Sequence, residues 1–213
     1  MSDTNQMLTF ASEALDSAQN YKLITAIVTP RPIAWVASLN DEGACNLAPF
    51  SSFTFISYDP PKVLISIGPG GAQRKDTTRN IVTRGEFTVS AVTPELLRPM
   101  VNSSYAFDRD QSEAEVLGLA LTPATQIATP YVATSPAALE CKLDRVIEVG
   151  DNDQHDMIIG TVTAFHVDSK VWAKDRIDPK LYQILGRLGG AVYVERGRLI
   201  SMAVPQAAPA QQG

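Results

Sequence analysis

Short segments with strand-like alternation recur along this chain, and turn-forming residues separate each from the next. Apolar residues take alternate positions in 53–58, 62–68 and 138–144, as they do in strands with one buried face. In the last of these segments the pattern assigns Glu140 to a solvent-exposed face. Many strands of similar length with a few short helices predict a mainly β fold, a closed β-barrel with peripheral helices.

Turn residues predict how neighbouring strands are joined. Asn-Asp-Glu-Gly at 40–43 predicts a hairpin between a strand at 33–39 and a strand that carries Cys45. The polar residues 150–154 predict a second hairpin, between the strand that starts at Ala138 and a long strand ending near Val167. Glu-Arg-Gly at 195–197 predicts a last hairpin.

Capping residues and helical spacing predict several short helices. Proline at the first helical position and Ser, Thr or Asp just before it are typical helix starts, and glycine after the last turn is a typical end. Asp76 is the expected N-cap of a helix through Arg84 that Gly85 ends. Further helices are expected at 10–20, from Thr93–Pro94 to about Val101, at Ser112–Glu115, and from Asp178–Pro179 toward Gly189.

Length and composition favour one soluble domain. The chain has 213 residues, of which 45% are hydrophobic and 19% charged, and no apolar run is long enough to cross a bilayer. A net charge of −5 offers no basic surface for nucleic acid, and no secretory signal precedes the first helix, so we expect a cytoplasmic protein. We expect one domain over 1–204 and a disordered Pro/Ala/Gln tail over 205–213; no role is assigned to 102–136.

The stretch 46–53, Asn-Leu-Ala-Pro-Phe-Ser-Ser-Phe, is unlike a plain buried strand. Small residues, hydroxyls and a proline leave main-chain N–H and C=O groups accessible, because Ala48, Ser51 and Ser52 add little bulk. Such a stretch suits a flat polar ligand. An ordinary loop of turn-forming residues explains the composition equally well.

The segment 73–79, Gln-Arg-Lys-Asp-Thr-Thr-Arg, has the composition of an anion site. A helix start offers free N–H groups, and Arg74, Lys75, Arg79 and the Thr77 hydroxyl add further donors. The pattern is not a P-loop, because no glycine directly precedes Lys75, nor does it complete a dinucleotide-binding glycine motif. A solvated helix start with basic neighbours is the alternative.

Histidines and cysteines do not form a recognisable catalytic or metal motif. His155 and His166 lie at opposite ends of one expected strand, and no ligand spacing surrounds them, so we assign no metal. His155 is either a turn residue or a ligand contact, and His166 is expected to be structural. Cys45 and Cys141 are expected to be free core thiols without a disulfide.

Several motifs together resemble the flavin reductase-like proteins, which have the FMN-binding split-barrel fold. The likeness extends over about residues 21–200 and lies in the order of its parts rather than in any one of them. The motifs are Pro-Arg-Pro-Ile-Ala-Trp-Val-Ala-Ser at 30–38, the stretch 46–53, Lys-Asp-Thr-Thr-Arg-Asn-Ile at 75–81, Gly-Glu-Phe at 85–87, and the segments 135–141, 159–162 and 187–190.

This resemblance implies a Greek-key split barrel that forms a homodimer and binds FMN near the dimer interface. It implies a phosphate site at the start of the helix near Lys75 and a ring site along 46–52. It also implies a nicotinamide contact at His155, although the family's Gly-Asp-His motif reads Asp-Gln-His here. The implied cofactor-binding residues are Trp35, Asn46, Ala48, Pro49, Ser51, Ser52, Arg74, Lys75, Asp76 and Thr77. For Trp35, a place in the core explains the residue equally well.

The first functional hypothesis is therefore NAD(P)H-dependent flavin reduction, with electrons passed to a small-molecule acceptor or to a partner enzyme such as an oxygenase. The flavin would carry the chemistry, so no catalytic side chain is assigned. An FMN-binding electron carrier or storage protein without NAD(P)H turnover is the second hypothesis. A barrel for another small ligand, without flavin, is the third.

Overall fold

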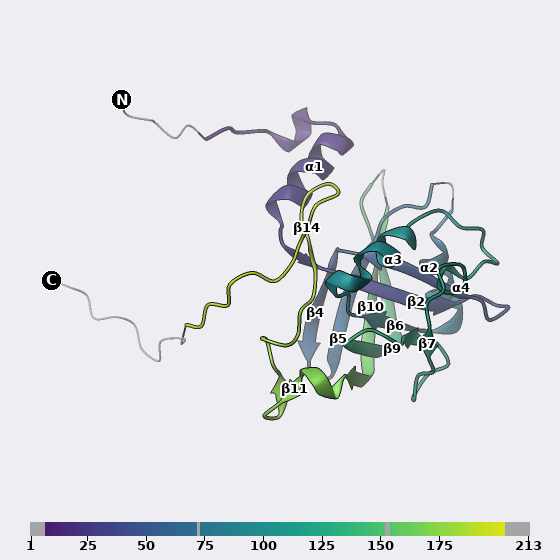
Figure 1. Ribbon diagram of the computed structural model, residues 1–213. Coiled ribbons are helices and arrows are strands. Elements are labelled where there is room, and N and C mark those ends of the chain that lie inside the picture. Colours follow the sequence, from purple (N-terminus) through teal and green to yellow (C-terminus); the bar gives the residue numbers. More distant parts are fainter. Residues whose placement is uncertain (1–6, 72, 152–153, 203–213) are drawn as a thin grey trace.

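Seven antiparallel strands form the main sheet of the computed structural model, which describes residues 7–71, 73–151 and 154–202 (Figure 1). Their order in the sheet is β3-β2-β6-β9-β10-β5-β4. The strands are β2 (Ala34–Leu39), β3 (Cys45–Phe50), β4 (Phe53–Tyr58), β5 (Pro61–Ile67), β6 (Glu86–Ser90), β9 (Ala137–Val149) and β10 (His155–Val167).

Two of the predicted hairpins are confirmed. β2 pairs with β3 across the turn at 40–43, with Ala37 opposite Leu47, and β9 pairs with β10 along almost their whole length. A crossover through α2 (Asp76–Arg84) takes the chain from β5 to β6, and the β9–β10 hairpin fills the space between those strands. The resulting order β5-β10-β9-β6 is a Greek key.

The sheet curls around a core of apolar side chains. Gly160 of β10 leaves room for the ring of Phe87, since a Cβ at that position would lie 2.5 Å from the Phe87 Cζ atom. No hydrogen-bonded ladder joins β3 to β4 among the described strands, so the curled sheet is open between its two edges. The buried core residues are Ala34, Val36, Val63, Ile65, Ile67, Ile81, Phe87, Val89, Cys141, Ile158 and Val162.

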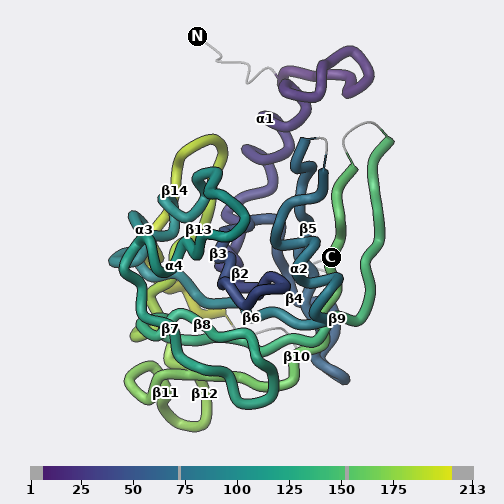
Figure 2. The backbone as a smooth tube through the Cα atoms, turned by 90° about the vertical axis from the view of Figure 1, so that its right-hand side faces the viewer, coloured from purple at the N-terminus to yellow at the C-terminus, as the bar shows by residue number. Residues whose placement is uncertain are grey.

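The outer face of β2 and β3 is also buried, which explains why 34–37 is apolar without alternation. The covering segment, seen along one flank in Figure 2, contains η2 (Pro94–Leu96), α3 (Leu97–Asn102), α4 (Glu113–Val116), β7 (Leu121–Thr122) and β8 (Tyr131–Val132). Trp35 is fully buried beneath it and donates its indole N–H to Ser103 Oγ at 2.9 Å. The region 102–136 is thus a cover for the sheet, and the expected helices after Thr93 and Ser112 are confirmed.

Helix α2 confirms one predicted boundary and shifts the other. Gly85 follows its last turn with φ +74°, the left-handed conformation that glycine tolerates best. The N-cap is Lys75 rather than Asp76, so Asp76 is the first helical residue and its carboxylate lies in the first turn. No helix in the described ranges is long and apolar enough to cross a membrane.

The N-terminal helix begins later than predicted. Residues 12–14 form only a 3-10 turn, η1 (Ser12–Ala14), and α1 spans Ser17–Ile27. Asp16 and Gln19 make a capping box that fixes this start, and it outweighs the weak apolar spacing in 10–20. Helix α1 stands away from the sheet (Figure 1), and none of its residues is buried.

The predicted helix after Asp178 is wrong. Leu181 and Tyr182 donate their N–H groups to the Asp178 carbonyl and complete a single turn. Leu185 N–H then binds the Val92 carbonyl at 2.9 Å, which ties the chain to the barrel as an extended segment. Before this turn the chain forms η3 (Ser169–Val171), β11 (Trp172–Ala173) and β12 (Arg176–Ile177).

The last hairpin lies earlier in the chain than the position 195–197 that was predicted for it. It joins β13 (Gly186–Arg187) to β14 (Tyr193–Val194), and β13 also pairs with β1 (Arg31–Pro32). Gly190, with φ +60°, makes the turn possible. The tail predicted for 205–213 lies outside the described residues.

Glu140 contradicts the predicted solvent-exposed face of β9. Its side chain is fully buried because residues 125–129 fold over this part of the strand. The alternation in sequence could not show this, since the covering loop comes from another part of the chain.

Candidate functional site

A polar cavity of about 600 Å³ lies between β3, the start of α2 and the segment that follows α3. It unites the two regions that the sequence singled out, the stretch 46–53 and the basic helix start. Seven of the ten predicted cofactor-binding residues line it: Asn46, Ala48, Pro49, Arg74, Lys75, Asp76 and Thr77.

The other three predicted residues lie elsewhere. Ser51 lines a smaller adjoining cavity of about 230 Å³. Ser52 is exposed at the bend before β4, where its carbonyl accepts the Ser66 N–H. Trp35 does not line the polar cavity, because its position in β2 turns the indole into the core beneath the 94–135 segment.

Contacts between β3 and α2 set the geometry of the polar cavity. Asn46 Nδ2 donates to Thr77 Oγ1 at 3.0 Å and joins the strand to the first turn of the helix. Gly70 makes the tight approach into α2 possible, since a Cβ there would lie 2.5 Å from the Gln73 carbonyl oxygen and 2.9 Å from the Lys75 nitrogen. Larger residues would displace the helix start.

The two adjacent basic residues have different partners. Arg74 forms ion pairs with Glu148 and, at 3.3 Å, with Asp156, both near the tip of the β9–β10 hairpin. Lys75 forms no ion pair in the described part of the chain, and its Nζ lies 5.9 Å from the centre of the Phe50 ring. Lys75 therefore contributes a positive charge that is not balanced by a neighbouring carboxylate.

Arg79 leaves a donor without a partner beside this cavity. Its guanidinium binds Asp76 and Gln73, but its Nε is buried and makes no hydrogen bond within the described ranges. An unsatisfied buried donor is unfavourable unless a ligand or water completes it. An acceptor atom of a ligand near the helix start would satisfy it.

Glu113, which the sequence analysis did not single out, also lines the polar cavity. Its Oε2 accepts the Leu47 N–H at 2.7 Å, and the residue is only 6% exposed. Burial raises the pKa of this carboxyl group, and the hydrogen bond from Leu47 opposes the shift only in part. Only the tertiary fold brings α4 against β3, so no local sequence signal identifies Glu113.

His155 does not line the polar cavity. Its ring lies over Gly68, and its Nδ1 is 3.3 Å from Ser66 Oγ. His166 has a structural contact, as predicted: its Nε2 is 2.6 Å from Glu140 Oε1, and its ring stacks on Tyr131. Cys45 and Cys141 are buried free thiols, and burial raises the pKa of Cys45 to about 12. The described residues contain no cluster of three or more potential metal ligands.

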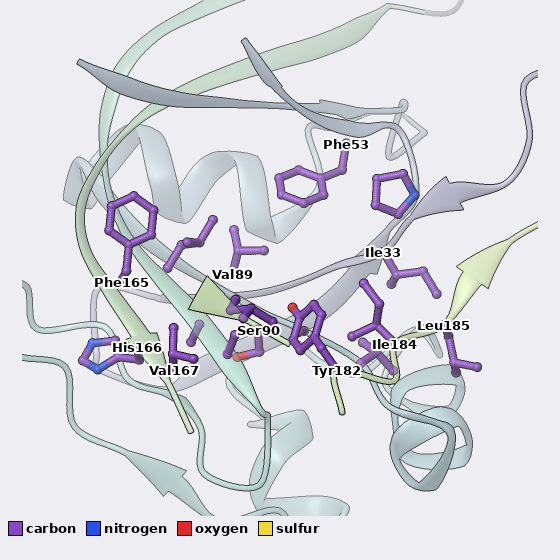
Figure 3. A pocket seen from close by; sticks show the side chains of 17 residues that line it. Ile33, Phe53, Val89, Ser90, Phe165, His166, Val167, Tyr182, Ile184 and Leu185 are labelled. Atoms are coloured by element: carbon purple, nitrogen blue, oxygen red, sulfur yellow. The ribbon is translucent and has the colours of Figure 1, made fainter. Parts of the chain in front are cut away.

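A separate cavity of about 190 Å³ lies where β6, β9 and β10 meet the 177–185 segment (Figure 3). Its walls are mainly apolar, with Phe53, Val89, Phe165, Ile184 and Leu185 around the ring of Tyr182. None of the predicted cofactor-binding residues lines it. The two cavities thus differ in chemistry, and only the polar one combines positive charge with free backbone donors.

Three solved structures are similar to this chain over almost its whole length. The 2-nitrobenzoate 2-nitroreductase of Pseudomonas fluorescens is 37% identical, with a TM-score of 0.88, covering 96% of this chain and all of that one. Component B of nitrilotriacetate monooxygenase from Bacillus cereus is 31% identical, with a TM-score of 0.90, covering 93% and 100%. A Shewanella frigidimarina protein with a split-barrel domain, 21% identical with a TM-score of 0.81 over 93% and 100%, supports the fold.

Sequence comparison agrees with the structural one. The Bacillus subtilis protein YwrF, itself uncharacterized, is 33% identical over 205 residues, which cover 93% of this chain and all of YwrF. The family model described as the flavin reductase like domain matches residues 27–183. The fold is therefore the split barrel that the motifs implied, and the protein has a flavin-related redox role. The chain belongs to the flavin reductase-like family.

Proposed function

We propose that this protein is an FMN-binding oxidoreductase that takes electrons from NADH or NADPH and passes them to a small-molecule acceptor or a partner oxygenase. One observation carries the proposal: the polar cavity joins the unpaired charge of Lys75 at a helix start to the outer edge of β3. FMN has matching parts, an anionic phosphate connected by a flexible chain to a flat ring with a polar edge.

The helix start suits the phosphate. Helix α2 has nine residues, and the N–H groups of its first turn have no acceptor within the helix. Lys75, Thr77 and Arg79 all line the cavity, and the Nε of Arg79 has no acceptor among the described residues. These groups would hold the phosphate by charge and by hydrogen bonds.

The edge of β3 suits the ring. The Leu47 N–H points to Glu113 and therefore away from β2. Residues two apart in a strand direct their backbone groups to the same side, so Pro49 presents its carbonyl to that edge and has no N–H to leave unsatisfied. The small side chain of Ala48 also lines the cavity and leaves space beside the strand.

Bound FMN would supply the hydride and electron chemistry, and the protein would bind and orient it. We assign no catalytic side chain. A contact between His155 and the nicotinamide would require NADH or NADPH to approach the flavin ring from outside the polar cavity, because the His155 ring lies over Gly68.

A visible spectrum of the purified protein, followed by stopped-flow mixing with NADH and NADPH, tests the proposal. We expect yellow protein, or protein that becomes yellow with FMN, and bleaching of the flavin absorbance within seconds. Yellow protein that neither nucleotide bleaches would favour the electron carrier, and protein that stays colourless with FMN would favour a barrel for another ligand.

Two kinds of acceptor follow from the similar structures. The Pseudomonas fluorescens protein is a nitroreductase, and the Bacillus cereus protein is a monooxygenase component. We propose that reduced flavin in this chain serves either a small nitroaromatic acceptor or a partner oxygenase. Oxidation of the reduced protein by 2-nitrobenzoate under nitrogen separates the two, since only the first acceptor would restore the yellow colour without a partner.

We also propose that the protein is a homodimer. Helix α1 buries no residue, yet Tyr21, Ile24 and Ile27 are each more than 60% exposed, and an isolated helix of this length is marginal in water. On β4, Phe55 and Tyr58 are similarly exposed at a sheet edge. Light scattering at micromolar concentration should give twice the monomer mass, and a monomer mass would contradict the proposal.

A further inference from the structure

The smaller cavity beside the polar cavity contains two arginines. We call it the arginine pocket and define it by Arg31, Arg187, Phe50, Tyr21 and Tyr193, which line its volume of about 230 Å³. Pro49, Phe50 and Ser104 line both cavities, so the arginine pocket shares a wall with the proposed flavin site.

The charge of Arg31 is not balanced by a carboxylate. Its Nη1 donates to the carbonyls of Thr25 and Val28, its Nη2 to the Leu188 carbonyl, and its Nε to Ser51 Oγ. These acceptors fix the guanidinium in place, but all of them are neutral. Because a guanidinium has five N–H donors, one has no acceptor among the residues that the structure describes.

Arg187 is held in a similar way. It donates to Tyr193 Oη and to the Gly190 carbonyl, and its guanidinium lies 4.4 Å from the centre of the Tyr193 ring. Most of its N–H donors have no partner among the described residues. No carboxylate in the described ranges lies within ion-pair distance of Arg31 or Arg187.

Two preorganised guanidinium groups in one cavity make it favourable for an anion. The aromatic side chains of Tyr21, Phe50 and Tyr193 favour a flat ring in the same space. A cavity of about 150 Å³ accommodates benzene, so the arginine pocket holds one substituted ring but not a dinucleotide.

We propose that the arginine pocket binds a monocyclic aromatic carboxylate. A member of this class that carries a reducible substituent, such as a nitro group, would take electrons from reduced flavin through that substituent; this role rests on the proposed function, because the pocket borders the proposed flavin site. The binding itself rests only on the two arginines, the aromatic walls and the volume.

Calorimetric titration of the FMN-loaded protein with benzoate and with benzamide tests this inference. The two ligands have nearly the same shape, and only benzoate is charged. We expect benzoate to bind at least about tenfold more tightly, or ~1.4 kcal/mol, as expected for a charge-assisted hydrogen bond. Arg187→Gln should abolish the preference, Arg187→Lys should retain part of it, and the exposed Arg196→Gln should leave it unchanged.

Equal binding of the two ligands by the wild-type protein would overturn the inference, and this measurement depends on no variant. Displacement of FMN by benzoate would also overturn it, since the pocket would then be part of the flavin site. If nucleotides bleach the flavin but benzoate shows no preference, only this inference fails. If the protein does not bind FMN, the proposed function fails instead, and the same titrations on the colourless protein still test the arginines.

Discussion

Two glutamates are buried in the described part of the chain, and their surroundings differ. Glu140 of β9 is fully buried and accepts hydrogen bonds from the Thr125 N–H and hydroxyl, the Gln126 N–H and the His166 ring. Burial by itself raises the pKa of Glu140, but the hydrogen bonds from Thr125, His166 and Gln126 outweigh it and hold the pKa at about 2.

Glu113 of α4 has a single described partner, the Leu47 N–H, and burial raises its pKa. A carboxylate with all its hydrogen-bonding capacity used is typical of a structural clamp, whereas an incompletely satisfied one beside a cavity is typical of a binding site. We therefore expect Glu140 to hold a loop against the sheet, and Glu113 to belong to the wall of a binding cavity.

The largest expected effect is on stability, from Glu140→Ala. Removing one partner of a buried charged network leaves the donors of Thr125, Gln126 and His166 unsatisfied, which costs about 3–5 kcal/mol of unfolding free energy. Urea denaturation measures the loss, with the exposed Glu42→Ala as a control. A loss below about 1 kcal/mol would show that Glu140 is not a structural clamp.

The second prediction concerns the loss of stability at low pH. Since the folded pKa of Glu140 lies below its unfolded value, its stabilisation is present above about pH 4.5 and is lost as the pH falls toward 2. The unfolding free energy of the wild-type protein should therefore fall more steeply than that of Glu140→Gln between pH 5 and pH 3. Parallel curves from urea titrations at each pH would contradict the assignment.

The third prediction moves to the polar cavity. Lys75→Ala should weaken FMN binding about tenfold or more, because it removes a charge-assisted contact worth about 1.5–3 kcal/mol. Flavin fluorescence titration measures the affinity, and Lys142→Ala, on the exposed side of β9, is the matched control. Unchanged affinity in Lys75→Ala would exclude the helix start as the phosphate site.

The smallest effect is expected from Glu113→Gln. The amide still accepts the Leu47 N–H but carries no charge. Because the folded pKa of Glu113 is raised, its contribution to stability is present at low pH and is lost as the pH rises. The variant should be more stable than the wild type by less than about 1 kcal/mol at pH 8, and equal to it near pH 4.

Urea titrations at the two pH values check this, with Glu115→Gln on the same helix as the control. If Glu113→Gln destabilised the protein at pH 8 as strongly as Glu140→Ala, the two glutamates would be equivalent and the comparison would not hold.

Local chemistry allowed much of the fold to be predicted. The Asn-Asp-Glu-Gly turn at 40–43, the polar tip before His155 and the glycine at position 85 each act within a few residues, so the β2–β3 hairpin, the β9–β10 hairpin and the end of α2 were predicted correctly. The basic start of α2 was also evident, because helix-end donors and neighbouring charges are adjacent in sequence.

The failures have a common cause. The helix expected after Asp178 does not form because Leu185 binds Val92, more than ninety residues away in the chain. Glu140 was expected on a solvent-exposed face, but residues 125–129 fold over it and bury it. Local propensity is a weak guide wherever a distant contact contributes more free energy than the local preference.

The sequence alone determined the strand-rich pattern, its hairpins, the family motifs and the two halves of a candidate site, because these depend on neighbouring residues. Only the tertiary structure decided that β3 and α2 meet in one cavity, that Glu113 borders it and Glu140 does not, and that Arg31 and Arg187 share a pocket. Those outcomes depend on packing between distant segments. The burial that raises the pKa of Glu113 and the hydrogen bonds that lower the pKa of Glu140 exist only once that packing has formed.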